Sequence, residues 1–281
     1  MIQTNLNSNK DIQKIFLNIK NSKVLQPFDE RIINFLNLFR ENLIKLNKTN
    51  NIIDIYALIF YLRKKNILKI KSEYNNLDHT IGIGVIFHVT PSNMPINFFY
   101  SYLFGLLSGS INIVRLPTKN FIQIQVIIKA FEKTIKNKKF NFIKNMTYFV
   151  RYNKESEFTK IISNFCDLRV IWGGDKTIED IRKFNLNVKS RDITFPDRHS
   201  FSLINNQKFN KLKDSEIKNL AKNFYTDGFF VDQNACSSPH IIFWVGKKNT
   251  TKINKFWKYV YEIKITNYDL PQKGLLEKFL L

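Results

Sequence analysis

Cys236 is the residue of this sequence best suited to nucleophilic chemistry. It lies within Asp-Gln-Asn-Ala-Cys-Ser-Ser-Pro at positions 232–239, directly after the apolar run 229–231. Small and polar neighbours leave a thiol accessible, and amide or hydroxyl groups can donate hydrogen bonds to the thiolate, which is the reactive form. The alternative is that Cys236 packs as a small core residue, the more common role of a free cysteine. Taken alone, the octapeptide favours the core role.

Other segments change that balance because they form an ordered set with the Cys236 segment. Residues 81–97 read IGIGVIFHVTPSNMPIN, residues 105–118 read GLLSGSINIVRLPT, and residues 168–175 read LRVIWGGD. Together with FPDR at 195–198 and DQNACSSP at 232–239, they resemble the aldehyde dehydrogenase superfamily, and within it the LuxC-type acyl-CoA reductases. The resemblance covers about residues 80–245. The combination of motifs is specific, although no single one would be.

The resemblance implies reduction of a long-chain acyl thioester to a fatty aldehyde, as in the supply of aldehyde to bacterial luciferase or in related pathways. Cys236 would be the nucleophile. Asn93, within Pro-Ser-Asn-Met-Pro, would donate to the oxyanion together with the backbone N–H of Cys236. A simpler role for Asn93 is to cap the helix that follows it.

The same resemblance implies a dinucleotide site formed by Thr90, Pro91, Arg115, Gly173 and Gly174. Arg115 stands where the family has a lysine that holds the adenosine ribose, and an arginine can bind a phosphate through two parallel hydrogen bonds. The residues that follow, Thr118 and Lys119, would tolerate a 2′-phosphate, so we expect NADPH, with NADH as the alternative. The Gly-Gly turn would lie near the phosphates at a helix N-terminus. The simpler interpretations are that Arg115 is a surface cation and that the Gly-Gly pair is an ordinary turn.

Phe195 is the most informative departure from the hydrolytic relatives. Alignment of Ser200 with the family's serine places Phe195 where those enzymes have a glutamate that activates water. A phenylalanine cannot act as a base and excludes water, which suits an acyl-enzyme that hydride rather than water must reach. The expected direction is therefore reduction. No metal site is expected, because the four histidines lack ligand spacing and no cysteine partners them.

The elements that must position these groups can be read from the hydrophobic pattern. A stripe of apolar residues predicts a helix within 28–47, and a second helix is expected over 54–65 with Asp54 as N-cap. From about residue 80, expected strands (81–89, 111–116, 146–152 and 168–172) alternate with expected helices (95–108, 123–136, 154–165 and 177–184). This order predicts an α/β fold with a parallel sheet covered on both faces, whose ligands bind at the carboxyl ends of the strands.

Beyond residue 191 the pattern resembles the start of a second α/β domain. Strands are expected at 200–204 and 240–245, and helices at 214–225 and 251–262. We therefore divide the chain into an N-terminal helical segment (1–79), a dinucleotide-binding domain (80–191) and a partial catalytic domain (192–281). The 45 residues after Cys236 (281 − 236) are fewer than aldehyde dehydrogenase-like enzymes carry.

The short C-terminal portion leads to two expectations. The first is an alternative function, a non-catalytic remnant that binds an acyl group or a nucleotide. The second is that the 281-residue chain by itself is poorly soluble or self-associates and has little reductase activity, because an incomplete sheet exposes an edge and an apolar face. A complete enzyme of this kind would act on acyl-CoA or an acylated carrier or synthetase protein. It would form a homo-oligomer or a complex with an acyl-protein synthetase.

Composition argues against two other classes of protein. The net charge is +21, from 44 basic and 23 acidic residues, but the lysines are scattered and no nucleic-acid-binding motif accompanies them. The uncharged run 96–114 contains glycines and polar residues, which favours a buried helix and strand over a membrane span. Only Cys166 and Cys236 are present, and Cys166, at the end of an expected helix, is expected in the core. With so few cysteines and an N-terminus that has no apolar core typical of a signal peptide, a reducing cytoplasm is the expected compartment.

Overall fold

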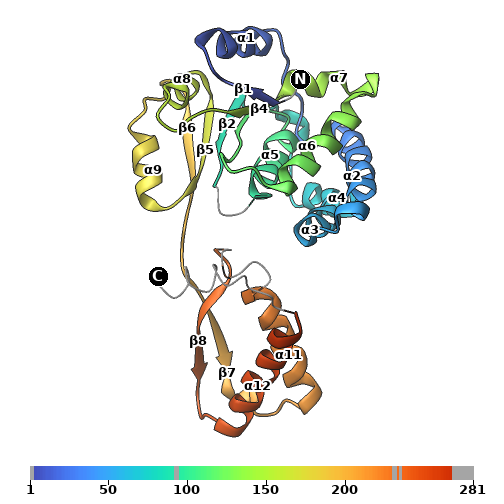
Figure 1. Cartoon of the computed structure of the whole chain (residues 1–281), viewed down its shortest axis with the longest axis vertical. Helices are drawn as coiled ribbons and strands as arrows, with labels where there is room; N and C mark the ends of the chain where they lie inside the picture. The colour runs from blue at the N-terminus through green and yellow to red at the C-terminus, as the bar shows by residue number, and fades with distance from the viewer. Residues whose placement is uncertain (1–2, 92–94, 230–232, 234–235, 268–281) are drawn as a thin grey trace. The chain divides into compact units, whose positions relative to one another are not determined.

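The computed structural model describes residues 3–91, 95–229, 233 and 236–267. The chain divides into two compact units, Met1–Asp197 and Arg198–Leu281, each of which is described by itself (Figure 1). The division falls a few residues beyond residue 191, where the sequence pattern places the start of the last segment.

A six-stranded parallel sheet forms the centre of the first unit. Its order is β1-β4-β3-β2-β5-β6, and every neighbouring pair is parallel. The strands are β1 (Gln3–Asn5), β2 (Val85–Val89), β3 (Ile111–Arg115), β4 (Thr147–Arg151), β5 (Leu168–Gly173) and β6 (Arg191–Pro196). The expected parallel α/β sheet is confirmed.

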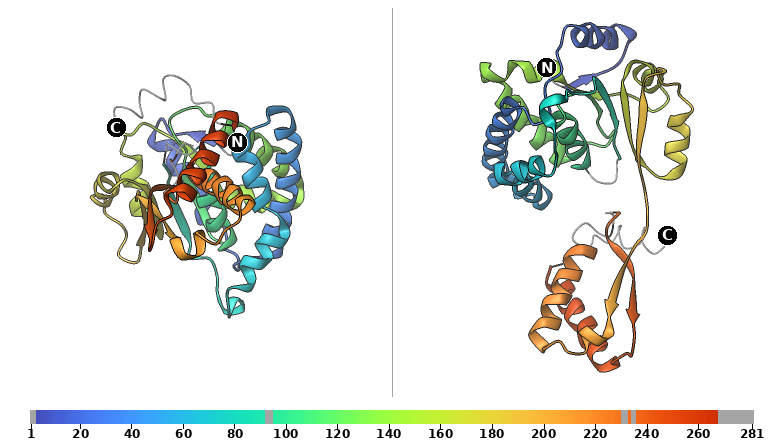
Figure 2. Two further views of the ribbon diagram at one scale, coloured as in Figure 1. Left: turned by 90° about the horizontal axis from the view of Figure 1, so that it is seen from below. Right: turned by 180° about the vertical axis from the view of Figure 1, so that it is seen from behind.

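Helices cover both faces of this sheet. Figures 1 and 2 show α5 and α6 on one side and α8 and α9 on the other. The helices of the first unit are α1 (Asn9–Lys20), α2 (Glu30–Asn50), α3 (Ile53–Tyr61), α4 (Lys64–Ser72), α5 (Asn97–Leu107), α6 (Ile122–Ile135), α7 (Asn141–Met146), α8 (Phe158–Phe165) and α9 (Asp175–Arg182), with short 3-10 turns η1 (Leu77–His79) and η2 (Lys138–Phe140).

Periodic apolar residues explain why the helices pack where they do. On α2, Ile32, Leu36, Phe39 and Leu43 are fully buried, as their spacing of three and four residues predicts. The uncharged run 96–114 is divided into α5 and β3, both largely buried, which confirms its reading as core. Among the described helices, none combines the length and the apolar character that crossing a bilayer would require.

The strand order creates a switch point next to β2. From β2 the chain proceeds outward through β3 to β4, and it then returns to the other side of β2 to form β5 and β6. The helices that follow β2 and β5 therefore lie on opposite faces of the sheet. In open sheets of this kind, ligands bind in the crevice outside the carboxyl ends of the strands at this point.

The edge strand β6 was not expected from the sequence. It pairs with β5 along its whole length, and a buried ion pair fixes it there. Arg169, whose side chain is 1% exposed, contacts Asp192 through Nε at 2.7 Å and through Nη2 at 2.9 Å. The other guanidinium nitrogen, Nη1, donates to Ser163 Oγ and to the carbonyl oxygens of Ile181 and Phe184. Each of the three guanidinium nitrogens thus has a hydrogen-bond partner, as a buried charge requires.

The N-terminal region differs from the expectation in three respects. Residues 3–20 form β1 and α1, neither of which the sequence pattern suggested. The helix expected over 54–65 is interrupted near Leu62 and becomes α3 and α4. Asp54 lies in the first turn of α3 rather than at the N-cap, which is Ile52, and its carboxylate accepts a hydrogen bond from Gln123.

The second unit contains a two-stranded parallel sheet, β7 (Ser200–Asn205) and β8 (Pro239–Val245), with α10 (Asn206–Phe209), α11 (Asp214–Phe229) and α12 (Thr250–Asn267). Its core is centred on Phe209, Ile217 and Phe256. Alternate strand residues are large, apolar and about half exposed or more: Phe201, Leu203, Ile241, Phe243 and Val245. Among the described residues this face has no covering element, and the expected self-association of the chain stays a prediction.

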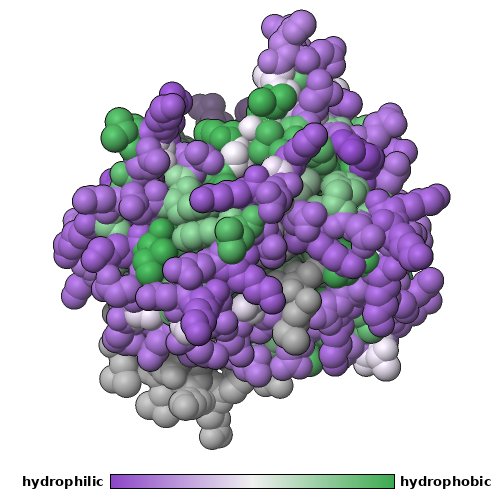
Figure 3. All heavy atoms as spheres, turned by 90° about the horizontal axis from the view of Figure 1, so that it is seen from above, coloured by the Kyte–Doolittle hydropathy of each residue, from purple (hydrophilic) through white to green (hydrophobic). Residues whose placement is uncertain are grey.

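Hydrophilic residues cover most of the face drawn in Figure 3, and the hydrophobic residues on that face form small separate groups. The net charge of +21 favours acidic ligands in general without specifying one.

Candidate functional site

The carboxyl ends of β2 and β3 bring two of the expected cofactor residues together. Val89 and Arg115, which end the two strands, are register partners. Thr90 follows directly, and its Oγ1 donates a hydrogen bond of 2.7 Å to the carbonyl oxygen of Arg115. Pro91 comes next and is partly buried. This hydrogen bond ties the loop after β2 to the end of β3, so the two segments form one edge of the switch-point crevice.

A second arginine stands beside Arg115 at the next strand end. The Arg115 guanidinium lies over the ring of Tyr152, 4.8 Å from its centroid, and burial raises the pKa of Tyr152 to about 12. Arg151, at the end of β4, donates to the carbonyl oxygens of Pro117 and Thr118. The loop after β3 is therefore held by one cation and flanked by another, an arrangement suited to an anionic group.

Gly173 and Gly174 form the turn between β5 and α9. Gly173 is the last residue of β5 and Gly174 is the N-cap of α9. A Cβ built on Gly174 would meet no atom within 4 Å, so there is space beside this residue. The backbone at the start of a helix suits a phosphate. With the cations at the ends of β3 and β4, these residues fit a dinucleotide lying across the switch point.

Trp172 and Phe195 form an aromatic pair at the same edge of the sheet. The two residues are register partners on β5 and β6, and their rings stack with centroids 4.0 Å apart and an interplanar angle of 13°. The side chain of Phe195 is 43% exposed. Sequence reasoning singled out Phe195 but took Trp172 only as the end of a strand. The signal available was its position directly before the Gly-Gly turn.

A buried polar network lies behind Trp172. The indole Nε1–H donates to Ser101 Oγ at 3.1 Å, Ser101 Oγ lies 2.8 Å from His88 Nδ1, and His88 Nε2 lies 2.9 Å from Asn112 Oδ1. Asn112 Nδ2 in turn donates to the carbonyl oxygen of Ser110 at 2.7 Å. His88 is 2% exposed, and burial lowers its pKa to about 4. The histidine is therefore neutral and fully hydrogen-bonded.

The buried neutral state of His88 predicts a loss of stability in acid. The pKa is 6.5 in the ordinary state and about 4 when folded, so between these values the unfolded chain binds a proton that the folded protein excludes. This contribution is complete above pH 6.5 and is lost toward pH 4, about 3 kcal/mol in total. Urea unfolding across this range measures it. A His88→Gln variant should lose that part of the pH dependence, and an unchanged dependence in the variant would contradict the assignment.

Cys236 belongs to the second unit and is exposed. The Oγ of Ser200, the first residue of β7, donates a hydrogen bond of 2.6 Å to the carbonyl oxygen of Cys236, which holds the cysteine turn against the start of the strand. His199 precedes Ser200 and His240 follows Cys236 by four residues, and the two imidazole rings lie edge to face with centroids 5.2 Å apart. The exposure of Cys236 removes the objection that it is a core residue. Its expected partner, Asn93, lies outside the described residues.

The other cysteine has the opposite environment. Cys166 is fully buried, its Sγ donates to the carbonyl oxygen of Ser163 at 3.4 Å, and burial raises the pKa of its thiol to about 12. A thiol that stays protonated and has no access to solvent is inert. The sequence prediction that Cys166 is a core residue is confirmed.

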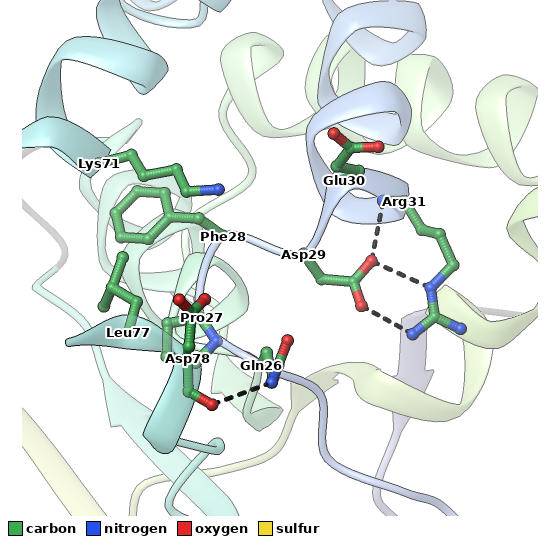
Figure 4. A pocket seen from close by; sticks show the side chains of 9 residues that line it. All are labelled: Gln26, Pro27, Phe28, Asp29, Glu30, Arg31, Lys71, Leu77 and Asp78. Carbon is green, nitrogen blue, oxygen red and sulfur yellow. Dashed lines mark hydrogen bonds and ion pairs between the residues drawn. The ribbon is translucent and has the colours of Figure 1, made fainter.

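A pocket of about 350 Å³ lies at a different place in the first unit (Figure 4). It is lined by the segment Gln26–Arg31 together with Lys71, Leu77 and Asp78. The neighbouring Leu25 hydrogen-bonds to Gly82 and Gly109, which precede β2 and β3, so the pocket is at the amino ends of the strands. Asp29 caps α2 and accepts two hydrogen bonds from the Arg31 side chain, which lowers the pKa of its carboxyl. These contacts hold the start of α2.

Over the described part of the chain, no cluster of three histidine, cysteine or acidic side chains could hold a metal ion.

The family model for acyl-CoA reductase (LuxC) matches residues 8–262. The comparison with curated proteins gave no match. Solved structures of related architecture were found in number, and three of them illustrate the likeness.

Proline utilization A (PutA) from Corynebacterium freiburgense aligns with a TM-score of 0.66 and 13% identity, over 94% of this chain and 27% of that one. The aldehyde dehydrogenase from Bartonella henselae gives 0.63 and 14%, over 93% and 57%. The glyceraldehyde-3-phosphate dehydrogenase GapN from Methanocaldococcus jannaschii, complexed with NADP, gives 0.63 and 13%, over 92% and 59%. The fold is that of aldehyde dehydrogenases, and the chain spans less than two thirds of each of these relatives.

Proposed function

The chain belongs to the acyl-CoA reductase (LuxC) family, and from this premise we propose that it takes part in the NADPH-dependent reduction of a long-chain acyl thioester to a fatty aldehyde. The observation that carries the proposal is the exposure of Cys236 within a family match that extends on both sides of it. An exposed thiol in a turn of small and polar residues can reach an acyl donor, whereas a core cysteine could not.

The proposed chemistry begins with acyl transfer to Cys236. Its thiolate attacks the carbonyl carbon of the acyl thioester, a new C–S bond forms, and the bond to the leaving thiol breaks. The leaving thiolate takes up a proton, and the acyl group remains on Cys236 as a thioester. The side-chain amide of Asn93 and the backbone N–H of Cys236 are the donors proposed for the oxyanion of each tetrahedral intermediate.

The first unit supplies the proposed residues for the cofactor. Arg115 and Thr90 at the ends of β3 and β2, with Pro91 beside them, would hold the adenosine end, and the turn Gly173–Gly174 would bind the phosphates. Lys119 follows Arg115 in the same loop, which supports NADPH over NADH. When bound, the dinucleotide supplies the hydride that reduces the acyl carbon, after which the aldehyde and the free Cys236 thiolate are released.

Long-chain acyl-CoA and an acylated carrier or synthetase protein are the proposed acyl donors. A homo-oligomer or a complex with an acyl-protein synthetase, and a place in the cytoplasm, are proposed on the same family grounds. The apolar face of β7 and β8, with Phe201, Leu203 and Phe243 exposed, supports an assembly of some kind because such faces promote association.

Two half-reactions test the proposal separately, so that a slow overall rate does not obscure either. In the first, the chain is incubated with radiolabelled acyl-CoAs of several lengths, and both protein-bound label and released CoA thiol are measured. In the second, NADPH is added and aldehyde is captured as a hydrazone. We expect one equivalent of label per chain and, at the low rate expected of the 281-residue chain by itself, aldehyde formed in step with NADPH consumption. Absence of stable labelling with every acyl-CoA would refute the proposal.

A glutamate at position 195 should divert the reaction toward hydrolysis. Phe195 cannot act as a base, and its 43% exposure leaves a glutamate at that place solvated and ionised. The variant Phe195→Glu is therefore expected to release more fatty acid relative to aldehyde, by about tenfold or more, since general-base assistance contributes about 10²–10⁴-fold. Product analysis with labelled acyl-CoA measures the ratio. Phe195→Gln, which has similar size but no basic carboxylate, is the control and should not show the increase.

A further inference from the structure

We infer that the stacked pair Trp172 and Phe195 is the platform for the nicotinamide ring, and that Ser101 and His88 are positioning residues that hold this platform. The inference rests on the proposed function, because it assumes that the first unit binds a nicotinamide dinucleotide. It gives Phe195 a second role and adds Trp172, Ser101 and His88, to which the motifs assign no role. All of them lie within the first unit.

The platform has the shape and chemistry that a flat heteroaromatic ring requires. Trp172 and Phe195 stack with an interplanar angle of 13°, and Phe195 is 43% exposed. Aromatic rings gain about 0.5–1.5 kcal/mol from such offset stacking beyond the burial of their area. Because the pair sits on β5 and β6, a ring bound against it lies on the side of the switch point opposite to Arg115 on β3.

The position along the sheet distinguishes the two ends of a dinucleotide. From β3 to β6 there are three strand intervals, at β3–β2, β2–β5 and β5–β6, or about 14 Å at about 4.8 Å each. An extended dinucleotide spans this kind of distance with its phosphates in the middle. If Arg115 binds the adenosine end and the Gly173–Gly174 turn binds the phosphates, the nicotinamide end lies against Trp172 and Phe195.

The hydrogen bonds behind Trp172 have only one consistent direction. Asn112 Oδ1 can only accept, so His88 Nε2 carries the proton and donates to it. The neutral ring then leaves Nδ1 as an acceptor, which takes the hydroxyl proton of Ser101. The Ser101 oxygen in turn accepts the indole N–H of Trp172 at 3.1 Å. Because each group has one role, the chain of bonds fixes the indole in a single orientation.

Gly105 shows how closely the fold accommodates this network. A Cβ at position 105 would collide with Asn112 Oδ1 and would lie 2.9 Å from His88 Nε2. Only a glycine allows α5 to approach the sheet over these two side chains. The network is therefore built into the packing of α5 on β2 and β3, which makes Ser101, one turn earlier on the same helix, a fixed anchor for Trp172.

Calorimetric titration with two ligands tests the inference. NADPH contains the nicotinamide ring, whereas 2′-phospho-ADP-ribose has the rest of the molecule without it. Trp172→Ala and Phe195→Ala are expected to weaken NADPH binding about tenfold and to leave the affinity for 2′-phospho-ADP-ribose unchanged. The unchanged affinity also reports that the variants are folded. Phe104→Ala, which removes an exposed aromatic from α5, is the control and should change neither affinity.

The positioning role of Ser101 has its own readout. Trp172→Phe keeps an aromatic ring but loses the N–H that Ser101 accepts. Ser101→Ala is expected to weaken NADPH binding about threefold when Trp172 is present and to have no further effect in the Trp172→Phe background. A merely structural role for Ser101 predicts the same effect in both backgrounds. Additive effects would therefore overturn the positioning assignment.

The outcomes separate this inference from the proposed function. If the wild-type chain binds neither ligand, the proposed cofactor site itself is wrong. If it binds both ligands, and Trp172→Ala weakens the binding of both equally or of neither, the cofactor site stands and the platform is wrong. An unchanged affinity for both ligands is also the result expected if the pair instead contacts an acyl chain.

Discussion

Replacement of Cys236 by alanine is expected to abolish acylation of the chain by radiolabelled acyl-CoA. The thiolate is the only group in the proposed scheme that can form the covalent intermediate, so reductase turnover should fall by about 10⁴-fold or more. Stability should change little, because the side chain is exposed and the contact with Ser200 uses only the backbone carbonyl of Cys236. Labelling is measured by gel autoradiography and by mass spectrometry of the acylated peptide.

Cys166 provides a matched control for that experiment. Its thiol is buried, and burial raises its pKa to about 12, so it should neither accept the acyl group nor react with iodoacetamide in the folded chain. A serine at this position can donate to the same carbonyl oxygen of Ser163. Cys166→Ser is therefore expected to keep full labelling. Label that persists in Cys236→Ala and disappears in Cys166→Ser would reverse the assignment of the nucleophile.

Replacement of Arg169 by methionine is expected to lower the free energy of unfolding of the first unit by about 3–5 kcal/mol. The guanidinium makes two contacts with Asp192, and its loss leaves that carboxylate without its closest partner. Two carbonyl oxygens and the Ser163 hydroxyl lose a donor as well. Because Asp192 is on β6, the variant should release the edge strand that also presents Phe195.

The measurement can be confined to the first unit. Trp172 is the only tryptophan of that unit, since the other two, Trp244 and Trp257, belong to the second. In a Trp244→Phe, Trp257→Phe background, urea unfolding followed by tryptophan fluorescence therefore reports on β5 and its neighbours. A loss well under 1 kcal/mol in Arg169→Met would contradict the importance given to this ion pair.

Arg182 offers a control that contacts the same carboxylate. Its Nε lies 3.7 Å from Asp192 Oδ2, but its side chain is 53% exposed. Exposed ion pairs contribute about 0–1 kcal/mol. Arg182→Met is thus expected to cost no more than about 1 kcal/mol, which would show that burial of Arg169, rather than the charge of Asp192, determines the effect.

Sequence and structure agree most closely where the signal is local. The stripe on α2 and the divided run of α5 and β3 follow from side chains three, four or two residues apart, which lie on one face of a helix or strand. The expected strands at 111–116, 146–152 and 168–172 begin and end within a residue or two of β3, β4 and β5. The roles proposed for Cys236 and for the strand-end residues also come from contiguous motifs, and they stay predictions.

Local pattern was insufficient where partners are distant along the chain. The residues of β6 alternate between exposed and half-buried, which says nothing about the sheet that they join. The ion pair between Arg169 and Asp192, 23 residues apart, holds β6 in the sheet. The break between α3 and α4 and the pairing of β1 with β4 also depend on residues distant in the sequence, because long-range contacts override local preference.

By itself, the sequence determined the parallel α/β class, most strands and helices of the first unit, the core role of Cys166 and the identity of the candidate nucleophile. These follow from periodicity and from short motifs. Only the tertiary structure decided that Trp172, Ser101, His88 and Asn112 form one network, because its hydrogen bonds join residues 13, 24 and 71 positions apart. Folding of α5 onto the sheet brings each polar group of the network within 3.1 Å of the next, and no local pattern encodes that approach.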